Sequence, residues 1–219
     1  MRKCVVILGA PGAGKGTQAK RVADAFGWAH ISTGDLLREA ARNQTDLGRQ
    51  AEGYMRRGEL VPDALIVGIV GDRLEESDCR NGFILDGFPR TVAQAEQLDA
   101  LLKRRGYTLN DVASIEVDEA EIVERLSKRL VCDSCGTMTT TDTARAGDPC
   151  SACSGRFIRR KDDEPETIQH RLEVYKESIR SLIAYFKGKG LLRPVEGTGS
   201  ADAVYERLLD ALGLTQEPR

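Results

Sequence analysis

Short apolar runs alternate along the chain with segments whose apolar residues recur every three or four positions. The runs Val5–Leu8 and Phe83–Leu85 predict buried strands, and the spacing of Ala19, Val22 and Phe26 gives a helix one apolar face. Further strands are expected at 112–117 and 191–195, and further helices at 62–74, 91–102, 119–130, 168–186 and 201–212. This alternation predicts an α/β fold, in which a parallel sheet is flanked by helices on both faces.

Two stretches interrupt this pattern. Residues 32–61 are polar and helix-prone and contain no predicted strand, whereas residues 131–163 are rich in Cys, Thr, Gly and Asp and show little helical periodicity. Both are therefore predicted to be insertions on the core sheet.

Length and charge narrow the class of protein. A chain of 219 residues allows one large domain, and its net charge of −2 comes from interspersed acidic and basic residues. A global basic field for nucleic acid is therefore absent, and no apolar run approaches the roughly 18 residues of a membrane span. We expect a cytoplasmic monomer that binds neither nucleic acid nor membrane.

The first strand is followed by a glycine-rich loop, residues 9–17, with the sequence GAPGAGKGT. Glycines allow successive amides to turn toward one anion at a helix N-terminus, and Lys15 can bridge the β- and γ-phosphates. Thr17 can donate to a phosphate oxygen, but Gly16 offers no hydroxyl to Mg²⁺. A turn without a ligand is the alternative. The predicted triphosphate-binding residues are Gly12, Ala13, Gly14, Lys15, Gly16 and Thr17.

Asp86 directly follows the apolar residues Phe83–Leu85. A carboxylate at the carboxyl end of a buried strand, beside a phosphate loop, suits Mg²⁺ bound through water. The alternative is an aspartate that only forms a turn.

Four cysteines form two C-x-x-C pairs, Cys132 with Cys135 and Cys150 with Cys153, which are separated by 14 residues. Each pair can present two thiolates from one knuckle, and four thiolates form a closed tetrahedral site that favours structural Zn²⁺. Two disulfides, redox pairs or bound iron are the alternatives.

Several motifs together resemble the adenylate kinase family in its long form with a zinc lid. They occur in the family's order and span nearly the whole chain. They are GAPGAGKGT (9–17), ISTGDLLR (31–38), GFILDGFPRT (82–91) and RRKDD (159–163), with Arg125, Arg129 and Arg171.

The resemblance implies reversible transfer from MgATP to AMP, which gives two ADP. It also implies a P-loop nucleoside monophosphate kinase fold with a five-stranded parallel sheet. The core would comprise residues 1–31, 62–125 and 164–219, with an AMP-binding insert at 32–61 (the insert) and a zinc-binding lid at 126–163 (the lid).

The resemblance also assigns roles to single residues. AMP would be bound by Thr33, Arg38, Gly87, Arg90, Gln94, Arg160 and Arg171, and ATP by the loop with Arg125 and Arg129. Lys15, Arg90, Arg125, Arg129, Arg160 and Arg171 would serve catalysis, and Asp162 and Asp163 would stabilise the closed lid.

Alternative functions follow from the same motifs. Base selectivity depends on few contacts, so a UMP/CMP kinase or a GTP-using AMP kinase remains a candidate. A second class is a zinc-ribbon protein that binds nucleic acid or a partner and uses nucleotide as a switch. Near-neutral charge and the lack of an aromatic platform weigh against this class.

Overall fold

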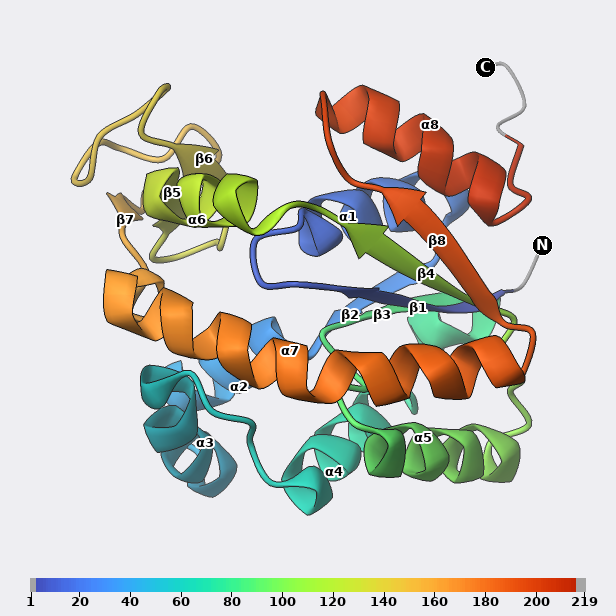
Figure 1. Cartoon of the computed structure of the whole chain (residues 1–219). Helices are drawn as coiled ribbons and strands as arrows, with labels where there is room; N and C mark the ends of the chain where they lie inside the picture. The colour runs from blue at the N-terminus through green and yellow to red at the C-terminus, as the bar shows by residue number, and fades with distance from the viewer. Residues whose placement is uncertain (1–2, 216–219) are drawn as a thin grey trace.

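The computed structural model describes residues 3–215 and is built around a parallel five-stranded sheet with helices on both faces (Figure 1). The strand order is β2-β3-β1-β4-β8, and every neighbouring pair is parallel. The predicted α/β fold with five parallel strands is confirmed. The strands are β1 (Cys4–Gly9), β2 (Ala29–Ser32), β3 (Phe83–Asp86), β4 (Asp111–Glu116) and β8 (Leu192–Glu196).

Both faces of the sheet are covered, which explains why its strands are continuous apolar runs. In β1, alternate side chains enter two different cores. Cys4, Val6 and Leu8 join the larger cluster, and Val5 and Ile7 join the other. Helices α1 (Lys15–Phe26) and α8 (Ala201–Ala211) pack on the second face. The remaining helices are α2 (Thr33–Arg42), α3 (Asp46–Arg57), α4 (Asp63–Arg73), α5 (Val92–Arg104), α6 (Glu119–Lys128) and α7 (Pro165–Gly188), with 3₁₀ turns η1 (Ser77–Asn81) and η2 (Lys161–Asp163).

The strand order creates a switch point beside β1. The chain leaves β1 for β2 on one side and leaves β3 for β4 on the other, so the loops at these two strand ends diverge. Ligands of open α/β sheets bind in the crevice that such a reversal leaves. The register pairs Ile7 with Asp86, which places Asp86 close to the start of the glycine-rich loop.

Strand β2 was not predicted from the hydrophobic pattern, although the other four strands of the sheet were. It has only four residues, and just Ala29 and Ile31 are buried. Two buried residues are too few to establish a period of two, and the flanking helices dominate the local pattern.

The two predicted insertions differ in structure. Residues 32–61 contain α2 and α3, whose first turns are capped by the side chains of Ser32 and Thr45. Residues 126–163 contain a separate antiparallel sheet of order β6-β5-β7. Its strands are β5 (Arg129–Cys132), β6 (Met138–Thr140) and β7 (Phe157–Ile158). The division into core, insert and lid stays a prediction, and residues 1–2 and 216–219 of the predicted core lie outside the described residues.

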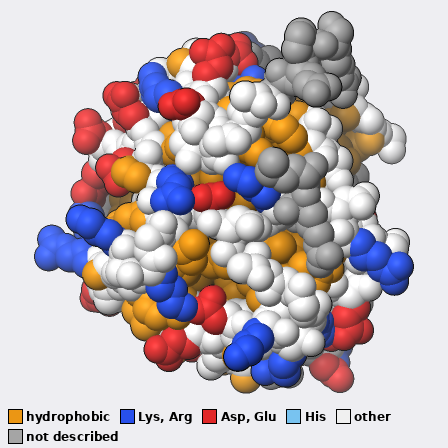
Figure 2. Space-filling model, turned by 90° about the vertical axis from the view of Figure 1, so that its right-hand side faces the viewer, with side chains coloured by type: hydrophobic (Ala, Val, Ile, Leu, Met, Phe, Trp, Pro, Cys, Tyr) orange, Lys and Arg blue, Asp and Glu red, His pale blue; other side chains and the backbone are white. Residues whose placement is uncertain are grey.

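The surface carries charges of both signs. On the face in Figure 2, acidic and basic side chains lie among each other and among small apolar areas. Between residues 3 and 215, no helix is long and apolar enough to cross a membrane.

Candidate active site

The glycine-rich loop joins β1 to α1 at the switch point. Gly14 precedes α1 with φ 90°, a left-handed conformation that glycine adopts without strain. Gly16 has a different role, because a Cβ there would lie 3.1 Å from Oδ2 of Asp86. The missing side chain at position 16 thus allows the Asp86 carboxylate to approach the first turn of α1.

Lys15 reaches back across this loop. Its Nζ donates to the Ala10 carbonyl at 2.9 Å. Burial lowers the pKa of Lys15 to about 8; Asp86 opposes this shift, and nearby arginines, led by Arg90, reinforce it. A lysine that is partly desolvated among cations is prepared for a strongly anionic ligand.

Asp86 lies between β2 and the phosphate loop. His30 Nε2 is 3.9 Å from its Oδ2, and the Thr33 hydroxyl donates to its backbone carbonyl at 3.3 Å. Burial raises the pKa of the Asp86 carboxyl, but His30 and Lys15 together hold it below its ordinary value. The carboxylate is therefore ionised at neutral pH, as a ligand of Mg²⁺ or of its waters must be.

A cavity of about 600 Å³ opens between the insert and the core. Buried Gln94 orders one wall, since its side chain accepts from the Arg90 amide at 2.7 Å and donates to Asp63 at 2.7 Å. Of the seven predicted AMP-binding residues, six line this cavity: Thr33, Arg38, Gly87, Arg90, Gln94 and Arg171.

Arg160, the seventh residue, belongs to a network of arginines and aspartates at the end of the lid. It donates to Asp162 at 3.0 Å, and Asp162 lines the cavity. Arg129 donates to the fully buried carboxylate of Asp163 at 2.7 Å, and Arg171 reaches the same carboxylate at 3.1 Å. Buried Asp163 and half-buried Asp162 thereby hold three arginines of the chain in one place.

Arg125 lies apart from this network. It donates to the Gly197 carbonyl at 2.9 Å and also pairs with Glu121. A Cβ on Gly14 would be 3.9 Å from Nη1 of Arg125, so this arginine faces the phosphate loop. The structure thus divides the predicted arginines between the loop and the lid end of the site.

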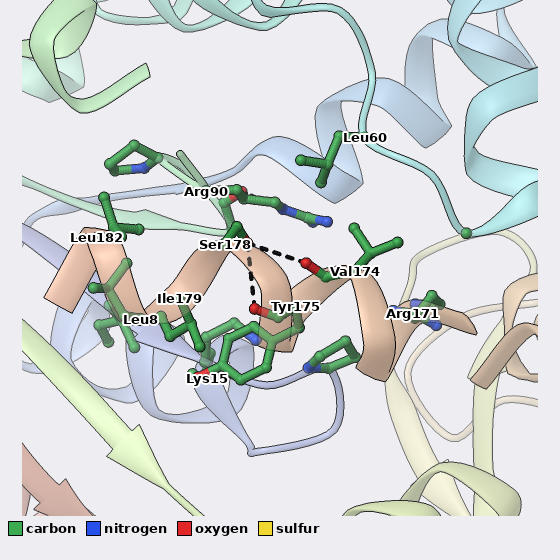
Figure 3. Close-up of a pocket in the computed structure, with 16 residues that line it drawn as sticks. Leu8, Lys15, Leu60, Arg90, Arg171, Val174, Tyr175, Ser178, Ile179 and Leu182 are labelled. Atoms are coloured by element: carbon green, nitrogen blue, oxygen red, sulfur yellow. Dashed lines mark hydrogen bonds between the residues drawn. The ribbon is translucent and has the colours of Figure 1, made fainter. Parts of the chain in front are cut away.

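A second cavity, of about 630 Å³, lies between the phosphate loop and α7 (Figure 3). It shares five lining residues with the first, so the two cavities adjoin, and Arg90 and Arg171 line both. The other shared residues are Gly58, Leu60 and Gly87. Lys15 lines it from the phosphate loop, and Val174, Ile179 and other residues line it from α7. The arrangement can hold two phosphate-bearing ligands with their charged ends together.

Two residues that orient this site were not predicted from the sequence. Asp35 accepts from Arg38 at 2.6 Å, and Asp63 accepts from Gln94. The first pair could have been found, because residues three apart on a helix are neighbours. The second joins α4 to α5, and no local spacing signals it.

The four clustered cysteines converge at the tip of the lid. Their Sγ atoms all lie within 4.8 Å of one another, with Cys132 to Cys153 at 3.5 Å and Cys135 to Cys150 at 3.7 Å. A tetrahedral metal with bonds of about 2.3 Å to sulfur requires edges of about 3.8 Å. The cluster therefore fits one metal ion, and the disulfide alternative is not formed, since all four cysteines are free.

Replacing Cys150 by alanine is expected to lower the melting temperature and abolish metal binding, because three ligands do not close a structural site. Metal analysis and thermal melts of the purified protein measure both effects. Cys79→Ala is the control for metal content only, since Cys79 lies outside the cluster but is buried in the core, where its loss also lowers stability. Ser151→Ala, at an exposed position beside Cys150, is the control for melting. A metal content near zero in the unmodified protein would contradict the assignment.

A glycine-rich loop at a switch point, facing paired cavities lined with arginine, defines a P-loop nucleoside monophosphate kinase. Similarity to known proteins identifies the family within this class. A family model for adenylate kinase matches residues 7–191. The adenylate kinase of Lachnospira eligens is 45% identical over 211 residues, covering 95% of this chain and 99% of the relative. That of Archaeoglobus fulgidus is 46% identical over 206 residues, covering 93% and 95%. The chain belongs to the adenylate kinase family, which confirms the resemblance of the motifs.

Proposed function

We propose that the protein transfers the γ-phosphoryl group of MgATP reversibly to AMP, which gives two ADP. One observation carries the proposal: two adjoining cavities share Arg90 and Arg171, with Lys15 and its loop lining one and Arg38 lining the other. A donor triphosphate and an acceptor phosphate held in these cavities would face each other.

Charge favours nucleotides that carry several phosphates. Two nucleotides bring on the order of six negative charges. Six cations face four carboxylates at the site, so bound phosphates would find an excess of positive charge. The cations are Lys15, Arg38, Arg90, Arg129, Arg160 and Arg171, and the carboxylates are Asp35, Asp86, Asp162 and Asp163.

The residue roles follow the path of the phosphoryl group. Gly12 to Thr17 would bind the triphosphate together with Arg125 and Arg129, while Lys15 bridges its outer phosphates. Thr33, Arg38, Gly87 and Gln94 would hold AMP. Arg90, Arg160 and Arg171 would align the two phosphates and stabilise the charge that develops in the transition state.

No general base is required. The AMP phosphate has a second pKa of about 6, so it is largely a dianion at neutral pH and is already nucleophilic. Catalysis then consists mainly of alignment and charge stabilisation, which fixed arginines supply.

Two metals belong to the proposal. Mg²⁺ bound with ATP neutralises phosphate charge, and the ionised Asp86 would hold it through water. Zn²⁺ in the four-cysteine cluster would fold the tip of the lid and has no open position for chemistry. Four clustered cysteines that form no disulfide suit a reducing compartment, which favours the cytoplasm, and we expect a monomer there.

Water must be excluded, or ATP would be hydrolysed. The lid residue Asp162, to which Arg160 donates, lines the cavity that insert residues line from the other side. Closure of these two segments over bound nucleotides would shield the phosphates, and their reopening would limit turnover.

The depressed pKa of Lys15 predicts a pH dependence. As pH rises through about 8, the free enzyme loses the Lys15 proton, so kcat/KM for ATP is expected to fall about tenfold per pH unit. Bound phosphates favour the ammonium form, hence kcat at saturation should decline only at higher pH. Profiles from pH 6 to 10 test this. Lys15→Arg should lack the alkaline decline, and a flat kcat/KM to pH 9.5 in the unmodified enzyme would contradict it.

A coupled assay for ADP tests the function. The chain should form ADP from ATP and AMP faster than from ATP and CMP, UMP or GMP, and ATP should be preferred to GTP as donor. Preference for CMP or UMP would favour the pyrimidine kinase alternative. Tight RNA binding without ADP formation would instead favour the zinc-ribbon class.

A further inference from the structure

A direct contact joins the insert to the tip of the lid. Arg42, in the last turn of α2, donates through Nη1 to the carbonyl of Asp133 at 3.1 Å and to that of Ser134 at 3.2 Å. These partners are 91 and 92 residues away in sequence. Deeper in the site, burial and the charge of Arg160 lower the pKa of Arg38, so the same two segments also approach there. The structure therefore describes the insert and lid in contact.

The two carbonyls belong to the first cysteine knuckle, residues 132–135. Within this knuckle the Cys135 amide points inward to Cys132 Sγ at 3.5 Å. The carbonyls of Asp133 and Ser134 face outward and accept from Arg42. The Asp133 carboxylate is occupied elsewhere, because it accepts from the Arg156 amide at 3.0 Å and the Ser134 hydroxyl at 2.9 Å. The contact of Arg42 therefore depends on the backbone conformation of the knuckle and not on its side chains.

The shape of the knuckle depends on the cysteine cluster. Cys132 and Cys135 are two of the four side chains that converge, and a bound metal would fix the peptide units between them. Without the metal, four thiol groups at these separations lose their common partner. The two outward carbonyls would then no longer converge on one guanidinium.

We infer that Arg42 is a latch that couples the metal knuckle of the lid to the AMP-binding insert and stabilises their closed arrangement. Arg42 is not among the residues that line either cavity, so its proposed role is to position the insert. The inference rests on the proposed function, since closure matters through the nucleotides that it encloses. Metal occupancy at the lid tip would thereby influence AMP binding in the insert.

Arg42→Ala is expected to shift the equilibrium toward the open form by roughly threefold to tenfold, the effect of losing a charged hydrogen-bond donor at an exposed site. KM for AMP should rise in proportion. The melting temperature should be unchanged and kcat should not fall, because the groups that contact the phosphates remain. A merely structural residue would instead lower the melting temperature and kcat together.

Closure can be measured by energy transfer between dyes at Glu52 in α3 and Ala146 in the lid, both exposed. Labels attached through genetically encoded non-thiol groups leave the cysteines free to bind metal. The equilibrium is read in the presence of Mg²⁺ and ADP. Arg49→Ala is the matched control, since Arg49 pairs with Asp46 inside the insert. It should leave the transfer efficiency unchanged.

Metal removal supplies the second arm. A zinc-selective chelator, with Mg²⁺ kept in excess, should open the unmodified enzyme at least as much as Arg42→Ala. In the metal-free protein, Arg42→Ala should then have little further effect, because the contact that it breaks is already lost. Equal energy transfer in Arg42→Ala and the unmodified protein would overturn the latch, as would fully additive effects. ADP formation by the unmodified chain is measured separately, and its absence would instead refute the proposed function.

Discussion

Replacing Lys15 by alanine is expected to slow ADP formation from ATP and AMP about a thousandfold, in the range found when a single charge-stabilising donor is removed from a preorganised site. Lys15 is the cation of the phosphate loop, and its Nζ already reaches across that loop to the Ala10 carbonyl. Alanine would leave the backbone cradle intact but leave the charge that develops between donor and acceptor without its nearest counter-ion.

Most of this loss should appear in kcat. The loop amides would still bind the triphosphate, so KM for ATP should change less than turnover. Lys20→Ala is the matched control, because Lys20 lies on the same helix and pairs with the exposed Asp24. Steady-state kinetics of both variants, with melting curves to exclude misfolding, measure the effect. Turnover of Lys15→Ala at the unmodified rate would refute the proposed alignment of phosphates.

Local sequence was sufficient to predict those parts of the site that are local in structure. The phosphate loop, the cysteine knuckles and the position of Asp86 at the end of β3 each depend on residues within a few positions of one another. Backbone and ligand requirements act at that range, so the residue types at fixed spacing indicate the chemistry.

Features that depend on tertiary contacts could not be read in this way. The three short strands of the lid, β5 to β7, contain four, three and two residues, which is too few for a hydrophobic period. The family motif marked Asp162 and Asp163 as lid acids, but only the structure pairs Asp163 with Arg129, 34 residues away. Likewise, the contact of Arg42 with the cysteine knuckle has no signature in the sequence around either partner.

Asp163 provides the second large prediction. Its side chain is fully buried and accepts from Arg129 at 2.7 Å and from Arg171 at 3.1 Å. Asp163→Asn keeps the shape of the side chain but removes its charge. The NH₂ group of the new amide is a donor, and it would face a guanidinium, which is also a donor. Breaking a buried ion pair from one side costs about 3–5 kcal/mol. The cost would fall mainly on Arg129, which pairs with Asp163, whereas Arg171 keeps its contacts with Asp162. The melting temperature should therefore fall markedly.

Activity should fall as well, on the order of a hundredfold, because both arginines are proposed to contact the transferring group and a small misplacement is costly in phosphoryl transfer. Asp142→Asn is the control: it is an exposed lid acid, 3.5 Å from Lys128, and should leave turnover and melting unchanged. If Asp163→Asn destabilises the lid too far for kinetics, its melting temperature relative to this control still tests whether the Asp163 charge stabilises the fold. A variant that melts and turns over like the unmodified enzyme would show that the Asp163 charge does not hold the arginines in place.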